Sequence, residues 1–85
     1  MLKIVGTVES CRVADVGKTA GTKNLRTYLV LDVESSEPEA ALKAREELIG
    51  TTELHFEKGT RVEATANVDP KHILRPMTLV GARAL

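Results

Sequence analysis

The sequence predicts a mainly β domain, a small five-stranded barrel, closed or nearly closed, with one helix at about residues 36–49. Two observations predict the strands: apolar and polar residues alternate over long stretches, and glycine- or proline-marked segments separate these stretches. A third, an Ala- and Glu-rich stretch in the middle, predicts the helix. The 85 residues suit one domain, residues 1–85, with a small core. Because short domains gain burial by oligomerising, we expect a homodimer.

The first strand is expected at residues 2–16. Leu2, Ile4 and Val8 share one face with Gly6, while polar and apolar residues mix on the other. Fifteen residues is long for one strand, and Gly6 is the expected point of a bend or bulge.

The second strand is expected at residues 25–34, with Leu29 and Leu31 on one face and Arg26 and Tyr28 on the other. It should form an antiparallel hairpin with the first strand, closed by the glycine- and lysine-rich loop 17–24.

The helix is expected to begin at Ser36, which with Glu39 fits a capping box, and to end at Gly50. Pro38 is tolerated in a first turn. The outer side of this helix carries acidic residues, among them Glu46 and Glu47, which we interpret as a solvated face.

Three further strands are expected after the helix, at residues 53–57, 60–69 and 77–84. A tight turn at Lys58-Gly59 joins the first two, and Val62, Ala64, Ala66 and Val68 should point inward. A loop bounded by Pro70 and Pro76 precedes the last strand.

Positive charge is sorted along a chain that is neutral overall. Residues 1–34 carry five basic and four acidic groups, residues 35–57 two and six, and residues 58–85 five and two. The cations gather in the two predicted loops and beside them: Lys18, Lys23 and Arg26 in the first cluster, Lys71, His72 and Arg75 in the second. Two cationic loops on a β scaffold indicate a groove for a polyanion.

The chain resembles small OB-fold single-stranded DNA-binding proteins of phage and plasmid type. The resemblance lies in MLKIVGTVES, in the basic hairpin GKTAGTKNLRTYLVLDV, and in FEKGTRVEATANVD followed by MTLVGARAL. It implies that the first hairpin loop and the last inter-strand loop flank a nucleic-acid groove. The implied contacts are Lys18, Lys23, Arg26, Lys71, His72 and Arg75. In the binding mode that we expect, Tyr28 would stack on a base and Arg61 would lie on the barrel face between the loops.

We therefore expect a non-catalytic module that binds single-stranded nucleic acid, DNA in particular. The chain has one Tyr, one Phe and no Trp, so binding should lean on phosphate contacts and depend steeply on salt. The alternative is a protein-interaction module or small adaptor subunit that uses a sheet edge or the acidic helix, and a ligand-binding or regulatory role is a third possibility.

The sequence indicates no enzyme, cofactor or metal site. His55 and His72 lie in different elements without cysteine partners, and the serines have no nucleophile-elbow context. No apolar run approaches the length of a membrane span, and MLKIVGTVES has no signal-peptide pattern. Cys11 is the only cysteine, which suits a reducing, cytoplasmic location.

Overall fold

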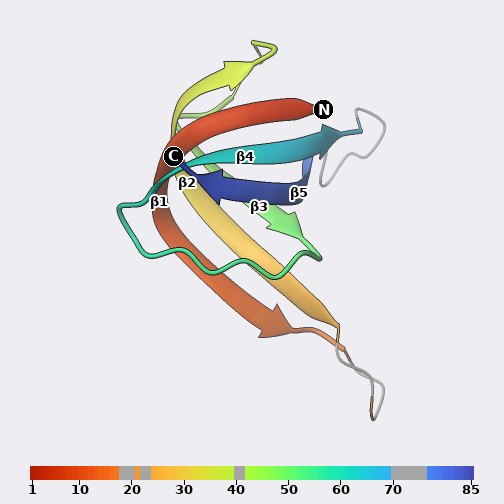
Figure 1. Ribbon diagram of the computed structural model, residues 1–85. Helices are drawn as coiled ribbons and strands as arrows, with labels where there is room; N and C mark the ends of the chain where they lie inside the picture. Colours follow the sequence, from red (N-terminus) through yellow and green to blue (C-terminus); the bar gives the residue numbers. More distant parts are fainter. Residues whose placement is uncertain (18–20, 22–23, 40–41, 70–76) are drawn as a thin grey trace.

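The computed structural model describes residues 1–17, 21, 24–39, 42–69 and 77–85, which form one sheet of five antiparallel strands. The strands are β1 (Leu2–Asp15), β2 (Leu25–Glu37), β3 (Arg45–Gly50), β4 (Arg61–Val68) and β5 (Met77–Ala84). Their order is β3-β2-β1-β4-β5, with β1 in the centre (Figure 1). The predicted mainly β, five-stranded class is confirmed. In the part of the chain that is described, no helix could cross a membrane.

Strand β1 bends strongly (Figure 1), and its pairing changes along its length: the first half is paired on both sides and the second half on one side only. Residues 2–7 pair with β4, whereas pairing with β2 runs on to Asp15 (Figure 1). The register with β2 shifts between Val5 and Gly6 and again between Val8 and Ser10. A Cβ on Gly6 would lie 2.5 Å from the Asp32 carbonyl oxygen, so only glycine permits this approach. The bend predicted at Gly6 is confirmed.

The curl brings the two outer strands, β3 and β5, into contact without a hydrogen-bonded ladder between them. A Cβ on Gly50 would collide with the Leu79 carbonyl group and would lie 2.9 Å from the Leu79 Cβ. Just beyond β3, the Thr52 hydroxyl donates a hydrogen bond to the Val80 carbonyl oxygen at 3.0 Å. The sheet is therefore curled upon itself but not closed.

The core lies inside the curl and draws on all five strands. Its buried members are Leu2, Ile4 and Val8 of β1, Leu29 and Leu31 of β2, Leu48 of β3, Val62, Ala64 and Ala66 of β4, and Leu79 of β5. The residues predicted to share one face of the first two strands are buried together, and the inward positions predicted in the strand at residues 60–69 are confirmed except Val68, which is 47% exposed.

An extended stretch between β3 and β4, the cross-over segment (residues 51–60), runs across β2 and β1 (Figure 1). The hydroxyl of Thr27, a residue with no exposed surface, donates to the Thr52 carbonyl at 2.6 Å and accepts from the Leu54 amide at 3.2 Å. Leu54 and Phe56 pack against the core. The segment thus covers apolar surface that the strands leave open.

The helix predicted at residues 36–49 is wrong for the described part of that range. β2 continues through Ser36, which pairs with Ile4 instead of capping a helix, and residues 45–50 form β3. Leu48 and Gly50 are buried while Glu47 is exposed, which is a two-residue period. Pairing along β2 and burial of Leu48 outweigh the modest helix preference of an Ala- and Glu-rich stretch.

The strand predicted at residues 53–57 is also wrong, because these residues belong to the cross-over segment and have no ladder partner. The turn predicted at Lys58-Gly59 is present, with Gly59 at a φ of 93°. It leads the cross-over segment into β4, and the Gly59 amide donates to the Val8 carbonyl at 2.8 Å. Apolar alternation alone could not distinguish this covering segment from a strand.

Gly50→Ala should lower the free energy of unfolding by about 1–3 kcal/mol, because the new methyl group would force β3 away from β5. Gly81→Ala is the matched control: it also lies in a strand, but a Cβ there has no atom within 4 Å, so its effect should stay within about 1 kcal/mol. Urea denaturation followed by circular dichroism measures both. Equal stability of the two variants would contradict the close β3–β5 contact.

Candidate nucleic-acid interface

Three of the eight predicted contact residues lie in the described part of the chain. Arg26 and Tyr28 are in β2 and Arg61 begins β4. The others lie outside the described residues, in the predicted loops: Lys18, Lys23, Lys71, His72 and Arg75. The described site is therefore built from strand residues.

The register shift between Val8 and Ser10 determines which side chains form the outer surface of β1. Glu9 is the extra residue at this shift. Before it, even-numbered residues such as Val8 face the core; after it, Cys11 packs against the core and Arg12 is exposed. The shift therefore reverses the alternation and turns Arg12 outward.

Arg12, Tyr28 and Ile49 lie in one row across β1, β2 and β3, since the ladders pair Arg12 with Tyr28 and Tyr28 with Ile49. In the next row on the same face, two residues further along, Ala14 of β1 pairs with Arg26. We call the surface formed by Arg12, Arg26, Tyr28 and Ile49 the hairpin face. It lies on strands rather than loops, so the ladders fix the backbone positions from which its side chains project.

The guanidinium of Arg12 lies over the ring of Tyr28, with its Cζ atom 4.0 Å from the ring centroid. This distance is well within the range of a cation–π contact. Arg12 was not among the residues predicted from the sequence. The signal that could have identified it is the bulge at Glu9, and nothing in the local sequence distinguishes that position from its neighbours.

Carboxylates hold the other described arginines. The ion pairs are Arg45 with Glu9 at 2.6 Å, Arg61 with Glu34 at 2.9 Å, and Arg83 with Glu63 at 3.3 Å. Within the described ranges, neither Arg12 nor Arg26 makes an ion pair. The hairpin face therefore carries two arginines whose charge no carboxylate neutralises by direct contact.

Arg61 is engaged by a carboxylate through two hydrogen bonds. Its Nε and one terminal nitrogen donate to the two oxygens of Glu34, each at 2.9 Å. These hydrogen bonds lower the pKa of Glu34 and raise that of Arg61. A phosphate approaching Arg61 must compete with Glu34, so Arg61 is less available to a polyanion than Arg12 and Arg26.

Asp15 makes hydrogen bonds to the residues on both sides of the first predicted loop. Its Oδ1 accepts hydrogen bonds from the amides of Gly17 at 2.9 Å and Asn24 at 3.1 Å, and the Val16 amide donates to the Asn24 carbonyl at 2.8 Å. The amide hydrogen bonds lower the pKa of Asp15. The stems of the segment that contains Lys18 and Lys23 are thereby held together next to the hairpin face.

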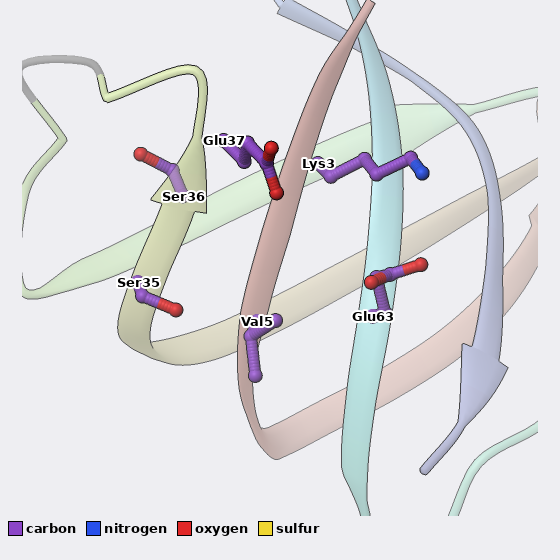
Figure 2. Close-up of a pocket in the computed structure, with 6 residues that line it drawn as sticks. All are labelled: Lys3, Val5, Ser35, Ser36, Glu37 and Glu63. Atoms are coloured by element: carbon purple, nitrogen blue, oxygen red, sulfur yellow. The ribbon is translucent and has the colours of Figure 1, made fainter.

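A hollow of about 280 Å³ lies elsewhere on the sheet, lined by Lys3, Val5, Ser35, Ser36, Glu37 and Glu63. Figure 2 shows Lys3 on the central strand, with Glu37 and Glu63 on the strands at either side. One cation between two carboxylates does not favour a phosphate. In the described residues no group of His, Cys, Asp and Glu could hold a metal ion.

Comparison of the chain with protein-family models, with curated proteins and with solved structures found no match.

The amide resonances of Gly17 and Asn24 should titrate with a midpoint below 3.8, the ordinary pKa of an aspartate. The pKa of Asp15 is lower in the folded state than in the unfolded chain. The ionised carboxylate therefore stabilises the fold fully above the ordinary pKa of an aspartate, and this stabilisation is lost as the pH falls through the lowered pKa. Two-dimensional NMR between pH 6 and about pH 2 follows the two amides. Asp15→Asn is the control and should abolish this titration; its persistence would contradict the assigned contacts.

Proposed function

We propose that the protein is a non-catalytic binding module for single-stranded nucleic acid, DNA in particular, and that the hairpin face is part of its binding surface. The observation that carries the proposal is the presence of two arginines free of carboxylate partners, Arg12 and Arg26, beside the chain's only tyrosine. Proteins that bind single strands combine two elements: cations that contact the nucleic-acid backbone, and planar groups that stack on the bases.

The strand order supports the same proposal. β1 pairs with β2 and β4, β2 with β3, β4 with β5, and β3 lies against β5. A ladder between β3 and β5 would complete a five-stranded barrel of OB type. In OB-folds, the face of strands 2 and 3 and the loops that join strands 1 to 2 and 4 to 5 bind oligonucleotides.

The predicted cationic loops join those same strands in this chain. Lys18 and Lys23 lie between β1 and β2, and Lys71, His72 and Arg75 lie between β4 and β5. The hairpin face includes Tyr28 of β2 and Ile49 of β3. We propose that the sugar–phosphate backbone of the nucleic acid contacts these cations while its bases contact the hairpin face.

The alternative, a protein-interaction module, would use either a sheet edge or the acidic helix, and the second of these surfaces is absent from the described residues. The acidic helix does not occur in the described part of residues 36–49, where Glu46 and Glu47 belong to β3. Glu46 also accepts a hydrogen bond from the Lys43 amide at 2.8 Å, which is a local structural role. A partner on a sheet edge remains an outcome that the binding experiment can reveal.

Fluorescence anisotropy with a labelled oligo-dT of about 30 nucleotides and a matching duplex, at 50 and 200 mM salt, tests the proposal. We expect the single strand to bind more tightly than the duplex and its affinity to fall steeply with salt. Arg26→Gln should weaken binding and reduce the salt slope by about 0.7, the share of one phosphate contact. Arg83→Gln, which removes an arginine already paired with Glu63, is the matched control and should change little.

Lys18→Glu combined with Lys23→Glu should abolish oligo-dT binding, because each change reverses a charge in the predicted cationic loop between β1 and β2. The same titration measures it, and circular dichroism confirms that the variant is folded. Undiminished binding would remove this loop from the interface. No binding of either DNA by the unmodified protein at tens of micromolar would overturn the proposed function, and a pull-down would then test for a protein partner.

A further inference from the structure

We propose that the base-stacking surface is the outer face of the Arg12 guanidinium, with the ring of Tyr28 serving as its support. This inference rests on the proposed function and assigns the stacking role to a different residue. In the free protein the Arg12 Cζ atom already lies 4.0 Å from the centroid of the Tyr28 ring. A base that stacked directly on this side of the ring would first have to displace Arg12.

The position of Tyr28 in the sheet favours this arrangement. Tyr28 pairs with Arg12 on one side and with Ile49 on the other, in the central one of three adjacent strands. Side chains on directly opposite residues of neighbouring strands lie close together. Tyr28 is accordingly half-buried, whereas Arg12 is exposed. Of these two planar groups, the guanidinium of Arg12 is therefore the more accessible to a ligand.

Arg12 is suited to hold a base in this position. The guanidinium is planar and weakly hydrated, and it stacks on aromatic rings with either of its two faces. In the described residues no carboxylate pairs with Arg12 and turns it away from the ring. Tyr28 therefore orders a cation whose second face remains available to an unstacked base, with which it makes a cation–π contact.

The ligand implied is a single strand whose bases can be splayed outward. Bases in a duplex are stacked on one another, so they cannot reach the guanidinium, and stacking carries little preference among bases. Arg26, diagonal to Arg12 across the β1–β2 ladder, is then available for a phosphate. The two arginines of the hairpin face thus have different roles, although their charges are the same.

Arg12→Lys and Arg26→Lys form a matched pair that separates these roles, because both keep the charge and only the first removes a stacked plane. The probes are oligo-dT and an abasic oligomer of the same length, each at 50 and 200 mM salt. Arg12→Lys should weaken oligo-dT binding about tenfold at both salt concentrations, leaving the slope unchanged. It should leave abasic binding unchanged, and Arg26→Lys should change either affinity by less than about twofold.

A second variant tests whether the ring of Tyr28 supports the Arg12 guanidinium. Tyr28→Leu keeps an apolar side chain beneath Arg12 but removes the aromatic ring, so it should weaken oligo-dT binding and leave abasic binding unchanged. If the unmodified protein binds oligo-dT but Arg12→Lys behaves like Arg26→Lys, or weakens abasic binding equally, the stacking role of Arg12 is overturned and the proposed function stands. If the unmodified protein binds no single strand, both fall. Urea midpoints of the variants confirm their folding.

Discussion

The strong bend of β1 is the constraint on which the rest of the molecule depends. β1 is paired on both sides along its first half and on one side along its second half, and two register shifts interrupt its ladder with β2. Such bulges bend a strand and increase its twist, and the two parts of the sheet curl about β1. The curl brings β3 against β5 and encloses a core whose fully buried members are all aliphatic. It also demands two close backbone approaches, at Gly6 and at Gly50, where a Cβ would meet a carbonyl group. The core is small, so the cross-over segment must cover what the strands leave exposed.

Three register shifts contribute to this curl, and each leaves an extra residue that makes a long-range contact. The extra residues and their partners are Glu9 with Arg45, Glu34 with Arg61, and the Val80 carbonyl with the Thr52 hydroxyl. A bulge redirects the side chain or carbonyl that it removes from the ladder. The same geometry that bends the sheet therefore also neutralises two arginines, and the shift at Glu9 turns Arg12 outward.

Local pairing, more than composition, determines where positive charge is available. The chain as a whole has equal numbers of basic and acidic groups. Surface ion pairs contribute little to stability, but they occupy the donors that a phosphate would use. Arg45, Arg61 and Arg83 are occupied in this way, whereas Arg12 and Arg26 are not. A chain that is neutral overall can thus carry, within its described residues, two arginines on one part of its sheet that no carboxylate pairs with.

The sequence by itself determined the β class, the bend at Gly6, which residues share a face in three strands and the clustering of cations in two segments of the chain, because alternation, glycine and charge are local signals. It placed Tyr28 and Arg26 on the outer face of β2 for the same reason. Only the tertiary structure decided that residues 45–50 pair as β3 and that residues 53–57 cover the core without pairing, because burial and ladder partners far along the chain outweigh local preference. The contact of Arg12 with Tyr28 and the occupation of Arg61 by Glu34 arise at bulges. A bulge depends on how two strands register against each other, and neither strand alone encodes it.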